Sequence, residues 1–221
     1  MERGIGRKLY ESVRSVSFSR AAGLAVAVAC VAAVSSCADT ESGTALPAPT
    51  GPQNYAVPDV STPLDVSSYL EDPCLLVPGG EPGKLGFSRP EPRLPEDDEV
   101  ARLAGPGCGW MESDNAGTLS VNIQTENVKR GTGGLAGVYQ SHFVTGQYVY
   151  LDPTDVEGYP AAFADGLDMR ERGKTTLYIG VADDLTISVS IGPFGRGKQK
   201  QAEDGAASIA AAAVRTLKGG S

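Results

Sequence analysis

The sequence predicts an α+β fold in which an antiparallel sheet is flanked by helices. Paired segments in the second half of the chain alternate apolar and polar residues, which is the period of a β-strand. Short turn sequences separate the members of each pair, which favours antiparallel hairpins. The chain closes with a long stretch of small apolar residues at helical spacing. Each strand has one apolar face, so helices are expected to cover one side of the sheet.

The first 36 residues have the layout of an export signal. Residues 1–20 are basic on balance, residues 21–34 are uncharged and mostly apolar, and small residues follow before Cys37. A membrane-spanning helix needs roughly 20 apolar residues. The shorter run here favours a cleaved signal peptide over a permanent transmembrane helix.

The stretch Val34-Ser-Ser-Cys37 resembles a bacterial lipobox. Cys37 is therefore the expected lipid attachment site, where a diacylglyceryl thioether and fatty acids such as palmitate would hold the protein on the extracytoplasmic face of the cell membrane. Cys30 is the rival position, but the residues before it fit the box less well. The alternative is a plain secretory signal that is cut near Ser36 and leaves Cys37 as a thiol.

Residues 37–64 are rich in Pro, Ser, Thr, Gly and Ala and have no periodic apolar pattern. This composition predicts a disordered tether. Residues 65–221 are predicted to form a single globular domain.

The elements of that domain follow from local patterns. Asp72 and Pro73 suit the N-cap and first position of a short helix. The acidic run Glu96–Glu99 suits a helix start and lacks the ligand spacing of a calcium loop. The remaining predictions are hairpins at 108–123 and 177–191, a helix at 135–143, strands at 148–151 and 159–163, and a helix at 201–217.

Cys74 and Cys108 are expected to form a disulfide, because no other partners remain if Cys37 is lipidated and Cys30 is removed. The bridge would pin the Pro/Gly-rich segment 78–107 against the first strand, with Trp110 beside the sulfurs. A metal site is not expected, because these two cysteines and His142, the only histidine, cannot supply the usual four ligands.

A family resemblance rests on Asp72-Pro-Cys74-Leu-Leu76, Cys108-Gly-Trp110, Glu157-Gly-Tyr-Pro-Ala161 and the Ala-rich final helix. Together these features look like an actinobacterial lipoprotein family catalogued as domain of unknown function 3558. The resemblance covers about residues 65–218. It implies a cell-envelope lipoprotein of unestablished activity, with the helix-flanked antiparallel sheet of PsbP-like proteins as a candidate fold. Many members carry a second cysteine pair, which this chain lacks.

No catalytic motif stands out. Gly192–Gln199 matches the spacing of a phosphate-binding loop, but Gln199 replaces the hydroxyl residue that holds magnesium, so no nucleotide cofactor is expected. A Ser-His-Asp triad would have to use His142. Four carboxylates cluster in the sequence without any two being marked as a pair: Asp152, Asp155, Glu157 and Asp165.

The net negative charge argues against one class of partner, nucleic acids. Residues 37–221 carry 14 basic and 25 acidic side chains, a net charge of −11 that repels phosphate backbones, so nucleic-acid binding is not expected. The expected function is that of a non-catalytic, lipid-anchored module that binds an envelope protein, glycan or lipid. The alternatives are an envelope hydrolase with paired carboxylates and a carrier of an apolar ligand.

Overall fold

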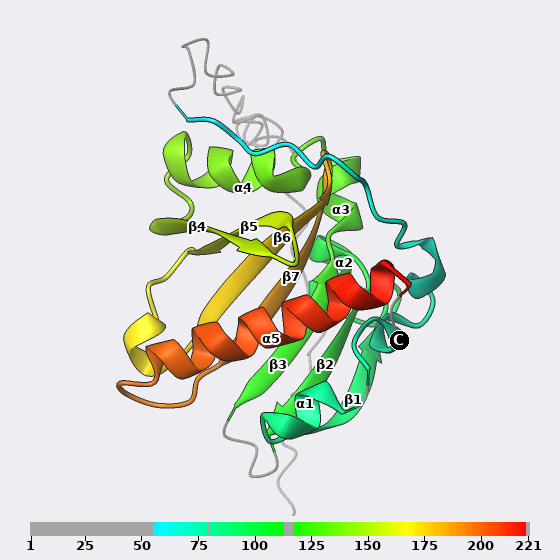
Figure 1. The fold of residues 1–221 in the computed structure, drawn as a ribbon, viewed down its shortest axis with the longest axis vertical. Coiled ribbons are helices and arrows are strands. Elements are labelled where there is room, and N and C mark those ends of the chain that lie inside the picture. Colours follow the sequence, from blue (N-terminus) through cyan, green and yellow to red (C-terminus); the bar gives the residue numbers. More distant parts are fainter. Residues whose placement is uncertain (1–54, 79, 113–116, 220–221) are drawn as a thin grey trace, which may run out of the picture. The chain divides into compact units, whose positions relative to one another are not determined.

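A computed structural model of the protein describes residues 55–78, 80–112 and 117–219, and it confirms the α+β fold. Seven strands form one antiparallel sheet in the order β1-β2-β3-β7-β6-β5-β4 (Figure 1). The strands are β1 (Phe87–Arg93), β2 (Gly107–Glu112), β3 (Thr118–Ile123), β4 (Tyr150–Val156), β5 (Tyr159–Asp165), β6 (Thr175–Ala182) and β7 (Leu185–Gly192).

Within the described ranges, five α-helices and three short 3-10 helices accompany this sheet. The α-helices are α1 (Glu81–Lys84), α2 (Glu99–Ala104), α3 (Thr125–Lys129), α4 (Gly134–Phe143) and α5 (Gln199–Leu217). The 3-10 helices are η1 (Ser67–Tyr69), η2 (Pro73–Leu76) and η3 (Arg170–Arg172).

The two predicted hairpins, β2–β3 and β6–β7, form the centre of the sheet. They join through β3 and β7, where Val121 faces Val189 and Leu119 faces Ile191. These four side chains are at most 1% exposed. The alternating pattern therefore places one apolar face of each strand in a common core.

Helix α5 lies diagonally across this apolar face (Figure 1). Its small residues bring it close to the sheet: a Cβ atom at Gly205 would lie only 3.0 Å from Cδ1 of Ile191. Ala206, Ile209 and Ala210 are fully buried at the contact. Buried side chains of α5 and of the strands form one apolar core between them.

Helix α4 covers part of the opposite face, so the prediction that helices cover only one side of the sheet is wrong. Neighbouring residues in a strand point to opposite faces. Ala161 of β5 belongs to the core under α5, whereas Ala162 packs with Leu135 and Val138 of α4. Because β5 carries apolar residues in succession, it can be buried from both sides.

The edge strand β1 lies in a segment without a clear strand pattern in the sequence. Pro90 and Pro92 lack the N–H group that a central strand needs, but prolines are tolerated at a sheet edge. Its pairing with β2 is irregular between Ser88 and Glu91. These features explain why the sequence pattern does not reveal β1.

The predicted disulfide between Cys74 of η2 and Cys108 of β2 is present. It links the start of the segment that contains β1 to the neighbouring strand β2. Cys108 is fully buried, and Trp110, on the same face of β2, is 4% exposed within the same core. Asp72 stands at the N-cap position of η2 as expected, but its side chain makes no capping hydrogen bond.

Residues 55–65, which we call the strap, pass over the domain without helix or strand structure and include the last ten residues of the predicted tether. Val60 is 7% exposed and belongs to the core, and its N–H donates to Oδ1 of Asp183. The N–H of Leu64 donates to the carbonyl oxygen of Val181. These contacts begin before residue 65, where the globular domain is predicted to start. The amino-acid composition of residues 37–64 predicts a tether and does not show that Val60 packs into the core.

The predicted signal peptide (residues 1–36), the lipid attachment site Cys37 and its rival Cys30 lie outside the described residues. Among the helices that the structure does describe, none combines the length and apolar character required to span a bilayer.

Candidate functional site

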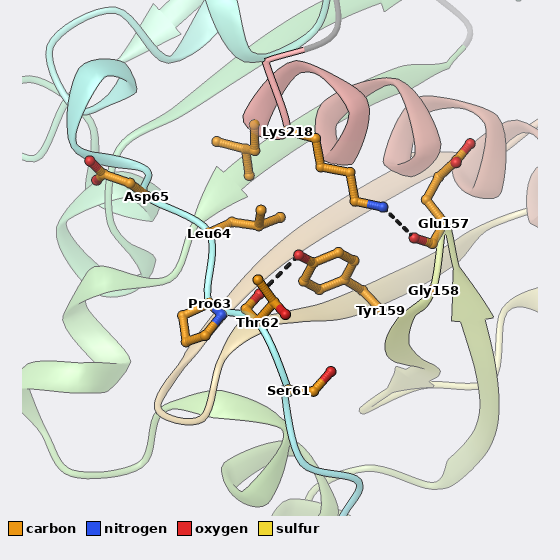
Figure 2. Close-up of a pocket in the computed structure, with 10 residues that line it drawn as sticks. Ser61, Thr62, Pro63, Leu64, Asp65, Glu157, Gly158, Tyr159 and Lys218 are labelled. Carbon is orange, nitrogen blue, oxygen red and sulfur yellow. Dashed lines mark hydrogen bonds between the residues drawn. The ribbon is translucent and has the colours of Figure 1, made fainter.

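A pocket lies where the strap meets the ends of two other elements. This strap pocket has a volume of about 610 Å³. One wall comes from the strap, one from the β4–β5 turn and one from the end of α5 (Figure 2). The lining residues are Ser61, Thr62, Pro63, Leu64, Asp65, Glu157, Gly158, Tyr159, Leu217 and Lys218.

Tyr159 is the central side chain of the strap pocket. Its phenol donates a hydrogen bond to the carbonyl oxygen of Thr62, 2.9 Å away, and so fixes the strap to β5 (Figure 2). The ammonium group of Lys218 lies 5.0 Å from the centre of the Tyr159 ring and donates to the carbonyl oxygen of Glu157 at 2.6 Å. One tyrosine thereby connects the strap, the β4–β5 turn and α5.

The β4–β5 turn owes its shape to two residues with positive φ. Glu157 has φ 55° and Gly158 has φ 83°, the signs found in a two-residue hairpin turn. The left-handed conformation is unusual for a residue with a side chain such as Glu157. Oδ1 of Asp155 accepts from the N–H of Gly158, and the Glu157 carboxylate forms an ion pair with Arg215 of α5. The stretch Glu157-Gly-Tyr is therefore held in place by the final helix.

The remaining polar groups of the strap pocket give it a mixed charge. Asp65 accepts a hydrogen bond from the backbone N–H of Ser67 at 2.8 Å, and this bond lowers the pKa of the exposed Asp65 carboxyl. Lys218 supplies a cation across the pocket. The arrangement suits a polar partner held by hydrogen bonds, and it does not present a paired acid and base.

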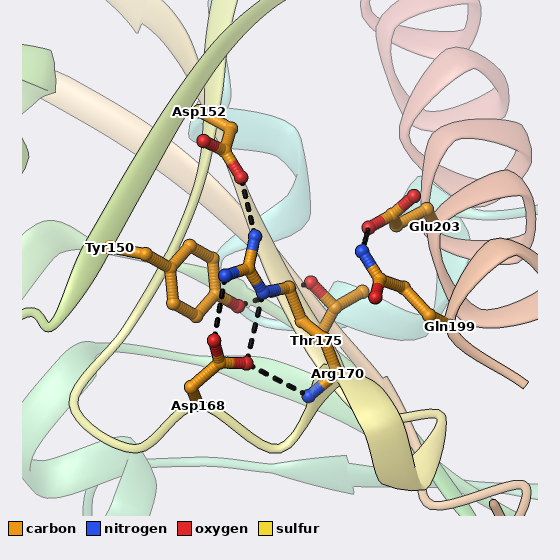
Figure 3. Close-up of polar contacts among 7 residues, drawn as sticks. All are labelled: Tyr150, Asp152, Asp168, Arg170, Thr175, Gln199 and Glu203. Carbon is orange, nitrogen blue, oxygen red and sulfur yellow. Dashed lines mark hydrogen bonds and ion pairs between the residues drawn. The ribbon is translucent and has the colours of Figure 1, made fainter. Parts of the chain in front are cut away.

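A second charged cluster surrounds Arg170. Its guanidinium donates to both carboxylate oxygens of Asp168 and to Oδ2 of Asp152, and it lies 3.9 Å from the centre of the Tyr150 ring (Figure 3). Burial raises the pKa of Tyr150 to about 12. The cluster ties the β5–β6 connection to β4, so the carboxylate of Asp152 is occupied by an ion pair.

The four carboxylates that lie close together in the sequence have different partners in the fold. Asp152 pairs with Arg170, Asp155 shapes the β4–β5 turn, and Glu157 pairs with Arg215. Asp165 stands at the end of β5, where burial is the main cause that raises its pKa. Each of the first three carboxylates is thus engaged in holding the fold together.

The glycine-rich stretch 192–199 connects β7 to α5, as its spacing suggests, but its amides are used within the fold. The N–H groups of Phe194, Gly195 and Gly197 donate to the carbonyl oxygens of the η3 region, at Gly173, Arg172 and Glu171. A phosphate-binding loop works by directing such amides at its ligand. In this loop three of them are already bound to protein.

His142 connects the last turn of α4 to the segment that precedes β4. Its Nδ1 atom lies 2.9 Å from the carbonyl oxygen of Tyr148, with which it forms a hydrogen bond. Across the described ranges, no group of three or more His, Cys, Asp or Glu residues is arranged to hold a metal ion.

A smaller and more enclosed pocket lies between α3 and α4, and we call it the tyrosine pocket. It has a volume of about 290 Å³. Two phenols line it, with the hydroxyl of Tyr148 2.8 Å from that of Tyr178. No sequence motif marks this site, because its residues are spread from position 127 to 178. The full lining is Asn127, Arg130, Thr132, Gly134, Gly137, Val138, Gln140, Ser141, Thr145, Gln147, Tyr148 and Tyr178.

Comparison with known proteins gives one match. A model of the family described as "Protein of unknown function (DUF3558)" matches residues 32–216. The two cysteine stretches and Glu157-Gly-Tyr of the strap pocket fall within that range, and the Ala-rich final helix does so up to Thr216. No curated protein and no solved structure matches the chain.

Proposed function

We propose that this chain, which belongs to the DUF3558 family of proteins of unknown function, is an exported lipoprotein that holds a non-catalytic binding domain at the outer face of the cell membrane. In this proposal Cys37 carries the lipid, the following residues act as the tether, and the domain binds a component of the cell envelope. The actinobacterial origin implied by the resemblance belongs to the same proposal.

The observation that carries the proposal is the disulfide between Cys74 and Cys108. Disulfides persist in oxidising compartments outside the cytosol, which supports export. The bridge uses two of the four cysteines. Of the two that remain, only Cys37 has a favourable lipobox before it, so the cysteine pairing supports lipid attachment at that position.

The fastening of the strap supports a role for the domain as an anchored module. The strap is the part of the chain that leads from the predicted tether into the fold, and Val60, Leu64 and the carbonyl of Thr62 each contact the domain. In the proposal, this fastening shortens the part of the tether that can move freely and so holds the domain closer to its anchor.

Metabolic labelling with a fatty acid tests the anchoring. The full chain is expressed in a bacterial host that processes lipoproteins, and label is expected in the wild type and in Cys30→Ala but not in Cys37→Ala. The Cys30 variant is the matched control, since it removes the rival cysteine. Label that persists in Cys37→Ala would overturn the proposed attachment site, and a wild-type protein without label would overturn the anchoring.

A further inference from the structure

Most residues that line the tyrosine pocket have side chains that form hydrogen bonds. The pocket contains three side-chain amides, three aliphatic hydroxyls and two phenols: Asn127, Gln140, Gln147, Thr132, Ser141, Thr145, Tyr148 and Tyr178. Amides and hydroxyls each offer donors and acceptors. The pocket therefore matches a ligand whose groups also do both.

Part of this hydrogen-bonding capacity is unused within the described part of the chain. Asn127 donates to Gln124 and accepts from Arg130, and Thr145 donates to the carbonyl oxygen of Ser141. In contrast, the side chains of Gln140, Ser141 and Gln147 make no hydrogen bond to described residues. These three lie close together in the sequence, at the second half of α4 and just after it. They form one wall of free donors and acceptors.

The two phenols are neutral hydrogen-bonding groups. Burial raises the pKa of Tyr148, and it raises that of Tyr178 well above its usual value, so both stay protonated at neutral pH. One hydroxyl donates to the other, which leaves one phenolic proton and the remaining lone pairs for a ligand. The rings, tilted at 32° to each other, add an apolar surface beside Gly137 and Val138.

Arg130 is the charged residue among those that line the pocket. It stands at the exposed rim, where its guanidinium donates to the carbonyl oxygen of Leu103 and to Asn127. Because this guanidinium is already hydrogen-bonded and no carboxylate is among the lining residues, the pocket favours a ligand without net charge.

We propose that the tyrosine pocket binds a single uncharged sugar ring of the hexose class. Hydroxyl groups that donate and accept around a ring with apolar faces match the amide and hydroxyl wall and the tyrosine surface. The volume of about 290 Å³ lies at the lower end of the range for small-molecule sites, roughly 300–1,000 Å³, and fits one ring rather than a chain of them. The proposal specifies the binding half of the function given above and does not depend on the lipid anchor.

Saturation-transfer NMR on the purified full chain tests the proposal with D-glucose, D-galactose and D-mannose as probes. At least one of the three is expected to give a saturable signal. Gln140→Ala is expected to weaken that binding roughly fivefold, the factor for one lost neutral hydrogen bond. Gln199→Ala, which removes an exposed glutamine side chain from α5, is the matched control and is expected to bind as the wild type does.

Tyr178→Phe provides a second variant that keeps the ring and removes one hydroxyl from the pocket. It is expected to weaken binding while thermal unfolding shows that the domain is still folded. The proposal is overturned if none of the three hexoses saturates the wild type, or if Gln140→Ala and Tyr178→Phe both bind as tightly as the control. Fatty-acid labelling at Cys37 tests the lipid anchoring separately. A negative result for sugar binding therefore does not affect the test of anchoring, and the reverse also holds.

Discussion

The phenol of Tyr159 donates to the carbonyl oxygen of Thr62 across 97 positions of sequence. This bond joins the strap to β5 beside the strap pocket. The same ring lies under the ammonium group of Lys218, near the end of the described chain. The strap and α5 therefore share one side chain as a common support.

Tyr159→Phe removes the hydrogen bond and keeps the ring under Lys218. We expect the domain to lose about 1 kcal/mol of unfolding free energy, the net contribution of one neutral hydrogen bond. Amide hydrogen exchange of the strap, at Leu64 above all, is expected to become faster. Tyr55→Phe is the control. Tyr55 belongs to the same strap, and a phenylalanine ring there keeps its stacking on Phe143. Equal exchange rates at Leu64 in the wild type and in Tyr159→Phe would show that the phenol does not hold the strap.

Reduction of the Cys74–Cys108 disulfide is expected to destabilise the domain. The bridge spans 34 positions, and the chain-entropy model assigns about 3–4 kcal/mol to a loop of that length. Urea unfolding with and without dithiothreitol measures the difference. The double variant Cys74→Ala, Cys108→Ala is the control, because dithiothreitol should leave its unfolding midpoint unchanged. A wild-type midpoint that does not respond to reduction would contradict the prediction.

Most of the sheet could be predicted from the sequence because its central strands have one apolar face. In β3 and β7 the alternation of Val121 and Val189 with polar neighbours reports burial directly. The final helix was predicted within two residues of its observed start at Gln199, since its alanines follow a helical period. The disulfide could be predicted because the other two cysteines, Cys30 and Cys37, are expected to be removed and lipidated, respectively.

What the sequence could not predict depends on contacts between distant segments. β1 contains two prolines and is a strand only because β2 offers its edge. The role of the strap depends on Tyr159, which lies far from it in the sequence. The tyrosine pocket is lined by residues of α3 and α4 and by Tyr178 of β6. No local sequence pattern predicts that these segments lie together.

Asp165→Asn is expected to change how stability depends on pH. Burial raises the pKa of Asp165 in the folded state above its ordinary value of 3.8, so the folded protein binds this proton more tightly than the unfolded chain does. The ionised carboxylate therefore costs stability at neutral pH, and the cost disappears as the pH falls through the raised pKa towards 3.8. The neutral amide has no such cost.

We therefore expect Asp165→Asn to be more stable than the wild type at pH 7 and to lose this advantage below about pH 4, the ordinary range of an aspartate pKa. Urea unfolding between these limits measures the difference. Asp97→Asn, at an exposed position, controls for the loss of one negative charge. An advantage that grows as the pH falls would have the wrong sign and would show that the Asp165 carboxylate stabilises the fold.

Arg170→Lys tests whether the cluster around Arg170 depends on the planar guanidinium. The guanidinium donates to both oxygens of Asp168, reaches Asp152 and lies over the ring of Tyr150. A lysine keeps the charge, but it cannot form the paired hydrogen bonds or stack as a plane.

The expected cost of Arg170→Lys is about 1 kcal/mol, since the side chain is 22% exposed and solvent screens part of the charge interaction. Arg172→Lys, two positions away on the exposed side of η3, is the matched control. Thermal unfolding at low and high salt separates the contributions. If the guanidinium geometry holds the cluster, high salt will leave most of the difference between the two variants in place, because hydrogen-bond geometry and ring stacking are screened less than charge. A difference that vanishes in high salt would instead show that Arg170→Lys weakens screened charge interactions, and it would contradict the role given to the guanidinium geometry.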